Sequence, residues 1–341
     1  MIITGRQQHK KTLSLGFIGL GWIGRNRMEV VLGSGNAKAV ILSEPQEQNA
    51  LEALQLAPEA TITNDPEKVY TTPDVDGIVI ATPSAMHAQQ SLKALEAGKS
   101  VFCQKPLGRT ATEVRGVVEA SRKANKLLAV DLSYRYTKAF QAVYDTISKG
   151  SIGKIYSVNL VFHNAYGPDK DWFYDIKQSG GGCVMDLGVH LIDMALYCLD
   201  FPKVNQVDSH LFSKGRKLAA QEENVEDFAT VTMLTADGTA ISLNCSWHVS
   251  AGQDAVIEAT FYGTEGGVAF KNVNGSFYDF KAEQYKGTAT ETLVSGTDHW
   301  SGRAGLAWAE KLQQGQGFDE KSSQEFIQNA ELIDRIYGRA N

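Results

Sequence analysis

The sequence predicts an α/β protein of two domains. A doubly wound parallel sheet is expected over residues 1–133, followed over residues 134–341 by an α+β domain with a large, mostly antiparallel open sheet. Three observations support this prediction. The chain has 341 residues, enough for about two average domains. From Leu13 onward short β-rich runs alternate with helical runs, and after about Tyr134 long β-rich stretches replace that alternation.

The alternating part predicts parallel strands with helices on both faces, because parallel strands need helical crossovers between them. The expected strands cover residues 13–20, 37–43, 76–82, 99–106 and 126–136, and the expected helices cover residues 26–35, 46–54, 84–98 and 111–125. Residues 1–12 are polar and basic without an apolar stretch, so we expect a loose arm there rather than a secretion signal.

The second part is dominated by β-rich stretches. They cover residues 154–164, 226–249, 255–270 and 275–285, and helices are expected over residues 138–150, 179–199 and 322–340. The Asp237–Gly238 pair between two alternating runs indicates a hairpin. The last helix is amphipathic and is free to pack back on the first domain.

Composition favours a small soluble ligand as the partner. The hydrophobic content of 43% and charged content of 21% are ordinary for a globular protein, and the net charge of −6 argues against binding to nucleic acid or to an anionic membrane. We find no apolar run long enough to cross a bilayer, and we expect a cytoplasmic protein. The four cysteines lack metal-ligand spacing, so reduced core thiols and no metal site are expected.

A glycine-rich turn predicts a dinucleotide site in the first domain. Gly19-Leu20-Gly21-Trp22-Ile23-Gly24 lies between the first strand and the first helix, with Glu44 about twenty residues further on. The first glycine permits the tight turn, the second lets backbone amides approach a pyrophosphate, and the third lets helix and strand pack closely. In this context the pattern is typical of a Rossmann domain.

Glu44 favours NAD over NADP. A carboxylate accepts hydrogen bonds from a free ribose 2′-hydroxyl and repels a 2′-phosphate, and the residues next to Glu44 include no lysine or arginine. Ser43 and Arg25 leave NADP open as the less favoured alternative.

Other candidate residues follow two later strands of the same sheet. Lys105 ends one strand and is followed by Pro106, and a lysine beside a nicotinamide can exchange a proton with a substrate hydroxyl. Thr82 and Pro83 end the strand before it, and His87 follows one helical turn later as a pocket-lining or capping residue. An ordinary solvent-exposed lysine is the alternative for Lys105.

The helix expected over residues 179–199 is apolar almost all round, yet one stripe carries Asp186, His190 and Asp193. Asp186 and His190 are four residues apart and can share a face, so the carboxylate could orient the imidazole as a general base. The alternatives are a satisfied core network between domains and, less favoured, a metal site, for which no third ligand is evident.

The chain resembles the glucose-fructose oxidoreductase and inositol dehydrogenase family, Gfo/Idh/MocA. The motifs that carry the resemblance occur in the family's order: GFIGLGWIGR, ATPSAMHA, VFCQKPLG, SGGGCVMDLGVHLIDMALYCL and GTEGGVAF. The resemblance implies a Rossmann domain followed by a domain whose open sheet mediates dimers or tetramers. It also implies that Lys105 matches the lysine of the family's Glu-Lys-Pro motif, and that Asp186 and His190 match its Asp-x-x-x-His pair.

Gln104 departs from the family pattern, because it replaces the glutamate before the lysine. This change puts the role of Lys105, and with it full redox competence, in question. The predicted catalytic residues are Lys105, His190 and Asp186. The predicted cofactor-binding residues are Gly19, Gly21, Trp22, Ile23, Gly24, Glu44, Thr82, Pro83, His87, Gln104 and Lys105. By the resemblance, the predicted substrate-binding residues are Arg135, His163, Trp172, Asp175, Asp186 and His190.

These observations together predict an NAD-dependent oxidoreductase that acts on a secondary hydroxyl of a sugar, sugar derivative or cyclitol, as a homodimer or homotetramer. His190 is expected to take the hydroxyl proton, with Lys105 bonded to the same oxygen. Two alternatives stay open. One is an enzyme that retains NAD and uses transient oxidation for elimination or glycoside cleavage, and the other is a redox-inactive protein that binds NAD or a sugar.

Overall fold

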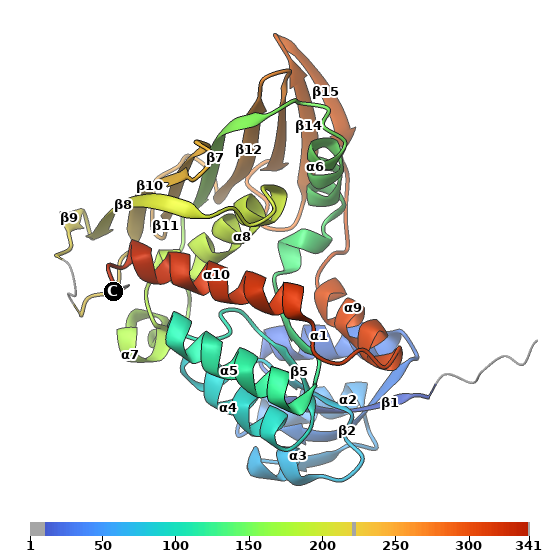
Figure 1. The fold of residues 1–341 in the computed structure, drawn as a ribbon. Coiled ribbons are helices and arrows are strands. Elements are labelled where there is room, and N and C mark those ends of the chain that lie inside the picture. The colour runs from blue at the N-terminus through green and yellow to red at the C-terminus, as the bar shows by residue number, and fades with distance from the viewer. Residues whose placement is uncertain (1–10, 220–222, 340–341) are drawn as a thin grey trace, which may run out of the picture.

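The structure is a computed structural model that describes residues 11–219 and 223–339. Most of the predicted N-terminal arm, residues 1–10, lies outside the described residues. Of the remainder, Lys11 forms an exposed ion pair of 2.7 Å between its Nζ and Asp76 Oδ1. The described chain forms two sheets and their covering helices (Figure 1).

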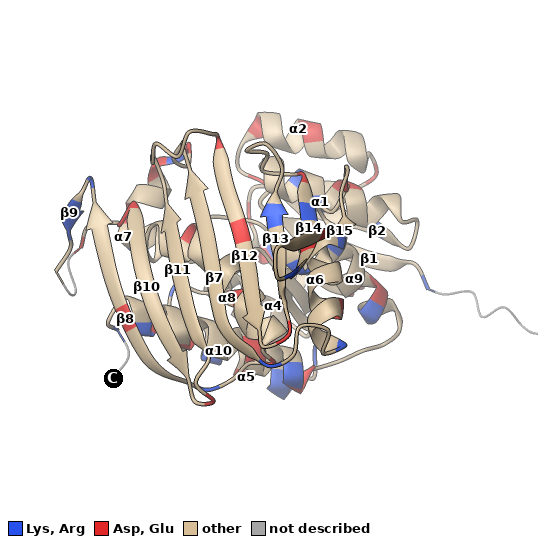
Figure 2. Cartoon of the chain, turned by 90° about the horizontal axis from the view of Figure 1, so that it is seen from above, with Lys and Arg blue, Asp and Glu red and all other residues tan. Residues whose placement is uncertain are grey.

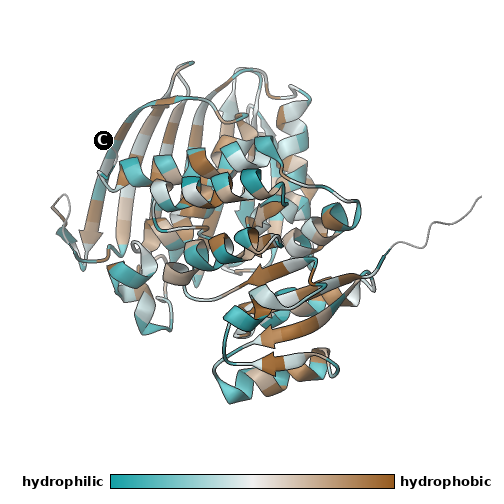
Figure 3. Cartoon of the chain, turned by 60° about the horizontal axis from the view of Figure 1, so that its bottom comes forward, coloured by the Kyte–Doolittle hydropathy of each residue, from teal (hydrophilic) through white to brown (hydrophobic). Residues whose placement is uncertain are grey.

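The first sheet has six strands in the order β3-β2-β1-β4-β5-β6, all parallel. The strands are β1 (Leu13–Ile18), β2 (Ala37–Ser43), β3 (Thr61–Thr63), β4 (Gly77–Ile80), β5 (Ser100–Cys103) and β6 (Leu128–Val130). Figure 3 shows most of these strands in the colours of hydrophobic residues, as expected of strands covered on both faces. The predicted doubly wound sheet is confirmed, with its crevice where the strand order reverses between β1 and β4.

Five helices connect these strands. They are α1 (Trp22–Gly33), α2 (Glu47–Leu56), α3 (Glu67–Thr71), α4 (Ser84–Glu96) and α5 (Ala111–Ala124). The N-cap of α4 is Pro83, which makes no side-chain hydrogen bond. Thr110 caps α5, because its hydroxyl accepts a hydrogen bond from the backbone of Glu113.

The second sheet has nine strands in the order β15-β14-β13-β12-β7-β11-β10-β8-β9. They are β7 (Ile155–Asn164), β8 (Val204–Ser213), β9 (Arg216–Lys217), β10 (Phe228–Thr235), β11 (Ala240–Ser246), β12 (Ala255–Gly263), β13 (Gly267–Asn272), β14 (Phe280–Lys286) and β15 (Ala289–Val294). Among the described strands of this sheet only β7 and β11 pair in parallel, so the predicted mostly antiparallel sheet is confirmed. The predicted hairpin at Asp237–Gly238 joins β10 to β11.

Helices cover one face of this sheet and leave the other face open (Figure 2). They include α6 (Lys138–Ser148), α8 (Val189–Cys198) and α10 (Glu320–Ile336), and α10 also packs along α5 of the first sheet (Figure 1). A further helix, α9 (Arg303–Gln313), packs on α1 although it follows the second sheet in sequence. The two layers are therefore joined by helices from the C-terminal part of the chain.

Two predicted elements differ from the structure. The strand expected over residues 126–136 ends at Val130, and a 3₁₀ turn, η1 (Ser133–Tyr136), carries Tyr134 into the aromatic core of the second sheet. The helix expected over residues 179–199 is divided into the short α7 (Ile176–Ser179), a π-helical turn η3 (Val184–Gly188) and α8.

The most apolar helical stretch lies inside the fold. Ile176–Cys198 is the one helical stretch, among the residues described, that is long and apolar enough to cross a membrane, but 83% of its apolar 18-residue window is buried inside the protein. The four cysteines are free and buried, as predicted.

Candidate functional site

The turn after β1 has the shape that a pyrophosphate site requires. Gly19 has a φ of +83°, and a Cβ there would lie 2.7 Å from the carbonyl of Ala81. A Cβ on Gly24 would lie 2.0 Å from Gly19 O, whereas a Cβ on Gly21 would meet open space. No side chain caps α1, so the amides of its first turn, at Trp22 and Ile23, are free to bind an anion.

Glu44 lies directly beside this turn. Its carboxylate accepts hydrogen bonds from the backbone N–H of Leu20, at 2.6 Å, and of Gln46, at 3.0 Å. This is the position from which an acidic residue reaches a ribose hydroxyl in a Rossmann domain. Arg25 pairs with Glu52 at 2.7 Å and donates to Asn49, so its charge already has a partner on α2.

His87 braces the two loops on the other side of the crevice. Its Nδ1 lies 2.7 Å from Pro106 O and its Nε2 lies 2.6 Å from Thr82 O, and only 1% of the residue is exposed. Burial lowers the pKa of His87, and these carbonyl contacts oppose that shift. His87 therefore positions the loops that carry Thr82, Pro83 and Lys105 and leaves no ring nitrogen for a ligand.

Lys105 reaches from the first sheet to the helix layer of the second. The Lys105–Pro106 peptide bond is cis. The Lys105 ammonium lies 2.7 Å from Asp186 Oδ1 and 2.8 Å from Asp186 O. The other carboxylate oxygen of Asp186 accepts a hydrogen bond of 3.1 Å from the indole N–H of Trp247, which follows β11. Residues from both sheets thus meet at one ion pair.

Asp186 does not bond to His190, contrary to the expected orienting contact. Both oxygens of the Asp186 carboxylate are used by Lys105 and Trp247. The π-helical turn η3 changes the helical spacing between residues 186 and 190, so the separation of four residues no longer places the two side chains as in an α-helix. The imidazole is instead packed edge-on against Tyr134, with ring centroids 4.8 Å apart.

The environment keeps His190 neutral. Burial lowers its pKa well below the usual value of 6.5, and the positive charges of Lys105 and Arg27 lower it further. A neutral imidazole can accept a proton at neutral pH, as a general base must.

Gln104 is held by a buried carboxylate. Its amide nitrogen donates to Asp131 Oδ2 at 2.6 Å, and its Oε1 accepts from the backbone N–H of Lys105 at 3.0 Å. The same Asp131 oxygen lies 2.6 Å from Arg27 Nε. Gln104 therefore fixes the backbone of Lys105 but does not bond to its ammonium.

Of the six residues expected to bind substrate, four lie in separate clusters: Arg135, His163, Trp172 and Asp175. Arg135 pairs with Asp193 at 2.5 Å and with Glu325 at 2.7 Å, so its guanidinium joins α8 to α10. Because Asp193 bonds to Arg135, the polar stripe predicted along residues 186–193 serves two separate clusters.

His163 lies on the sheet face opposite to that of its neighbour Phe162, which packs in the core beneath α8. Its Nδ1 is 2.8 Å from Ser246 Oγ, and its ring stacks on Phe228. Asp175 caps α7, because its carboxylate accepts from the backbone N–H of Lys177 at 2.9 Å.

Of these four residues, Trp172 is linked through aromatic contacts to Trp247, the residue that bonds to Asp186. It stacks on Phe173 at 3.8 Å, and Phe173 meets Trp247 edge-on at 6.3 Å. Sequence reasoning did not single out Trp247, Arg27 or Asp131. Trp247 has no motif of its own, and the contacts of Asp131 with residue 27 arise only when the chain folds.

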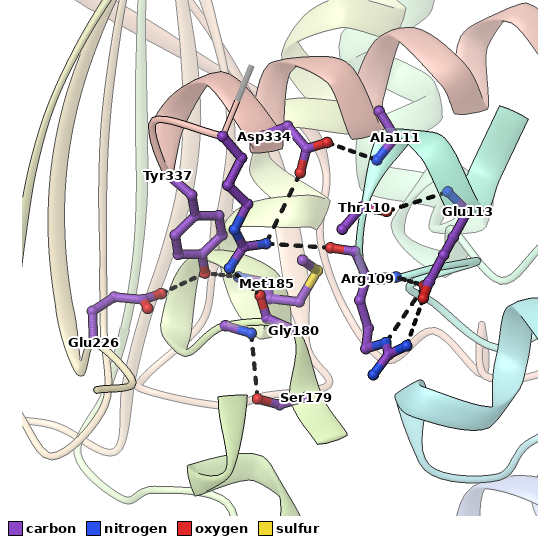
Figure 4. Close-up of polar contacts among 12 residues, drawn as sticks. Arg109, Thr110, Ala111, Glu113, Ser179, Gly180, Met185, Glu226, Asp334 and Tyr337 are labelled. Atoms are coloured by element: carbon purple, nitrogen blue, oxygen red, sulfur yellow. Dashed lines mark hydrogen bonds and ion pairs between the residues drawn. The ribbon is translucent and has the colours of Figure 1, made fainter. Parts of the chain in front are cut away.

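A buried clasp holds the segment just before Asp186 (Figure 4). The Glu226 carboxylate accepts hydrogen bonds from the backbone N–H groups of Gly182 and Val184, both at 2.9 Å, and from the hydroxyl of Tyr337 at 2.7 Å. The Tyr337 hydroxyl also accepts from the backbone N–H of Met185 at 3.2 Å. These bonds satisfy amides that no side chain caps within the segment itself.

The glycines of this segment are needed for the clasp. A Cβ on Gly181 would lie 2.1 Å from the Tyr337 hydroxyl, and a Cβ on Gly182 would lie 1.8 Å from Glu226 O. The run Gly180-Gly181-Gly182 therefore lets Glu226 and Tyr337 approach the backbone that leads to Asp186.

Two family models match the chain along most of its length. The model described as the oxidoreductase family, NAD-binding Rossmann fold, matches residues 13–132, and the GFO/IDH/MocA C-terminal domain matches residues 140–269. The chain belongs to the GFO/IDH/MocA family. The family resemblance stated from the sequence motifs is thereby confirmed.

Curated relatives of this GFO/IDH/MocA chain are named as sugar and cyclitol dehydrogenases. The D-glucoside 3-dehydrogenase of Escherichia coli is 28% identical, and the match covers 61% of this chain and 62% of that relative. The levoglucosan dehydrogenase of Pseudarthrobacter phenanthrenivorans is 27% identical, over 76% and 74% of the two chains. An inositol 2-dehydrogenase of Rhizobium meliloti is 28% identical, over 76% of each.

Solved structures confirm the family fold at lower sequence identity. Levoglucosan dehydrogenase in complex with NADH and levoglucosan superposes with a TM-score of 0.80 at 22% identity, covering 96% of this chain and 97% of its own. KijD10, a 3-ketoreductase from Actinomadura kijaniata in complex with NADP and TDP-benzene, gives a TM-score of 0.82 at 19% identity, covering 97% and 98%.

Proposed function

We propose that the protein is an NAD-dependent oxidoreductase that acts on a secondary hydroxyl, or the matching ketone, of a sugar, sugar derivative or cyclitol. One observation carries the proposal: the Lys105–Asp186 ion pair, with His190 on the same helical segment, stands at the carboxyl edge of a parallel sheet that also carries an open glycine turn. The names of the relatives support the substrate class.

The residues divide the work of proton transfer. Bound NAD would accept or donate the hydride, and the glycine turn with Glu44 would hold it. Lys105 donates hydrogen bonds to the substrate oxygen, and Asp186 with Trp247 fixes the ammonium in place. In oxidation His190, which is neutral, accepts the hydroxyl proton; in reduction it returns one.

Glu44 is the basis for proposing NAD rather than NADP. The carboxylate lies beside the glycine turn, where it would repel a 2′-phosphate, and the charge of Arg25 is already paired with Glu52.

We further propose a cytoplasmic homodimer or homotetramer formed through the open face of the second sheet. Along this sheet the strands carry few charged residues (Figure 2), and Leu234 and Tyr262 are exposed on it at 36% and 38%. No role in binding nucleic acid or membrane is proposed. Among the described residues, no group of three or more potential metal ligands gathers.

A substrate panel tests this function. Sugars and cyclitols are incubated with NAD or NADP, and the absorbance of the reduced nicotinamide is followed. We expect turnover with NAD, and a loss of at least about 100-fold in kcat on the best substrate for His190→Ala, because a general base contributes that much or more.

The control for this variant is His299→Ala, which changes an exposed histidine. NADH binding, followed by fluorescence, shows whether His190→Ala still folds and holds the cofactor. Full activity of His190→Ala would refute the assignment of the base. Tightly retained NAD with substrate cleavage but no net NADH would refute the dehydrogenase in favour of an enzyme that oxidises transiently.

A further inference from the structure

A row of aromatic side chains runs outward from Asp186. Trp247 holds the Asp186 carboxylate through its indole N–H. Beyond it, the ring of Tyr174 meets the indole at 5.6 Å between centroids, and the ring of Phe173 meets it at 6.3 Å. The catalytic ion pair is thereby continuous with aromatic surface on the segment between β7 and α7.

The outermost rings form what we call the outer shelf: Tyr174 and His248. Tyr174 is 45% exposed, and its ring stacks with that of His248 at 6.3 Å and an interplanar angle of 21°. The Tyr174 hydroxyl lies 3.1 Å from His248 Nε2 and donates to Pro168 O at 3.0 Å. The shelf therefore offers aromatic faces whose edges carry hydrogen-bonding groups.

The shelf is fixed before any ligand arrives. A Cβ on Gly167 would lie 2.2 Å from His248 Nε2 and 2.3 Å from the Tyr174 hydroxyl, so the backbone there packs directly against both side chains. Asp175 caps the helix that follows Tyr174. A pre-organised surface of this kind loses little conformational entropy when a ligand binds to it.

The shelf is linked to the ion pair by one continuous set of contacts. Lys105 bonds to Asp186, the Trp247 indole N–H bonds to the same carboxylate, and the Trp247 ring meets the ring of Tyr174. Burial raises the pKa of Tyr174, and the charge of Asp186 adds to that effect, which places the phenol within electrostatic range of the site. A ring resting on the shelf is therefore the neighbour of the reacting ring.

We propose that the outer shelf binds the second ring, a sugar or an aryl aglycone, of a glycoside whose first ring carries the reacting hydroxyl. This inference rests on the proposed function and narrows its substrate class from free polyols to glycosides. Aromatic faces suit the apolar face of such a ring, and the Tyr174 and His248 edges suit its hydroxyls.

The test compares two ligands that differ only in the outer group: phenyl and methyl β-D-glucopyranoside. We expect wild type to favour the phenyl glycoside by about three- to tenfold in kcat/KM. Tyr174→Ala should remove this preference through KM, with kcat on the methyl glycoside unchanged, and Tyr174→Phe should retain it. Tyr156→Ala, which removes an exposed tyrosine at the far end of β7, is the matched control.

Binding is measured in parallel, by titrating each glycoside into the NADH complex and following the heat released. Should wild type oxidise polyols without favouring the phenyl glycoside, or should Tyr174→Ala keep the preference, the shelf inference fails while the proposed function stands. A change in oligomeric mass for Tyr174→Ala would assign the shelf to a subunit contact and overturn the inference.

Should wild type oxidise none of the panel, the proposed function fails and the binding data decide on the shelf alone. Tighter binding of the phenyl glycoside that is lost in Tyr174→Ala supports it, and equal binding of the two glycosides overturns it.

Discussion

At the scale of single residues, the site depends on which partner each ionisable group has. Asp186 is occupied by Lys105 and Trp247, so His190 is left with an apolar neighbour, Tyr134, and two positive charges within electrostatic range. The carboxylate thus positions the lysine, and burial keeps the imidazole unprotonated and so available to accept a proton.

The low pKa of His190 links stability to pH. In the unfolded chain the imidazole binds a proton below about pH 6.5, but the folded protein resists that proton until a lower pH. The contribution of unprotonated His190 to the free energy of unfolding is therefore fully present above about pH 6.5. It is lost as the pH falls toward the pKa of His190 in the folded protein. We expect His190→Gln to show a smaller decrease in Tm between pH 7.5 and 5.5 than wild type, as measured by thermal unfolding.

His299→Gln, at an exposed position, is the control and should follow the wild-type curve. An unchanged pH dependence in His190→Gln would mean that the imidazole is not held neutral by the fold.

Sequence reasoning identified the residues of the site better than their contacts. Sequence motifs predict Lys105, Asp186 and Glu44. Lys105 follows β5 and Glu44 lies beside the glycine turn, as expected. Asp186, however, lies in a π-helical turn and bonds to Lys105 rather than to His190. Local spacing could not reveal the π-helical turn, because that turn depends on Glu226 and Tyr337, which are distant in sequence from Asp186. The same limit applies to Arg135 and His163, whose partners belong to other elements.

At the scale of elements, the glycine run before η3 and the clasp form one unit. Strands and helices of the first sheet could be predicted because parallel βα units carry strong periodic patterns. The short β3 and α3 escaped prediction because three to five residues hold too little pattern. The interruption of the helix predicted over residues 179–199 follows from tertiary bonds to its backbone.

Two glycine substitutions compare a glycine that the clasp requires with a glycine inside an ordinary helix. Gly182→Ala would drive a methyl group to 1.8 Å from Glu226 O, so we expect it to lower the free energy of unfolding by at least about 2 kcal/mol and to decrease kcat. Gly116→Ala, inside α5 with open space around it, should raise the free energy by about 0.5 to 1 kcal/mol. Denaturant unfolding measures the free energy of unfolding of both variants. Equal changes in the two variants would contradict the claim that the clasp requires glycine at position 182.

At the scale of the whole molecule, buried ion pairs tie the helix layers together. Arg135 on η1 binds Asp193 on α8 and Glu325 on α10, and α10 in turn packs along α5 of the first sheet. These carboxylates are 3% and 8% exposed, so each depends on the guanidinium as its counter-charge.

Removing that charge should weaken the whole assembly. We expect Arg135→Leu to lower the free energy of unfolding by about 3 to 5 kcal/mol, because two buried carboxylates lose their partner. Arg115→Leu removes an exposed ion pair with Glu331 and should cost at most about 1 kcal/mol. Both free energies of unfolding are measured by denaturant unfolding. Similar decreases for the two variants would show that the Arg135 cluster is not a buried junction.

The clasp also has a consequence for the order of events during synthesis. Met185 and Tyr337 are 152 residues apart, so at about 5 to 20 residues per second the ribosome makes the helix with Asp186 roughly 8 to 30 s before it makes the hydroxyl that bonds to that helix. Until then the amides beside Asp186 have only water and Glu226 as acceptors. A nascent chain therefore carries the proton-transfer residues well before it can hold them in place.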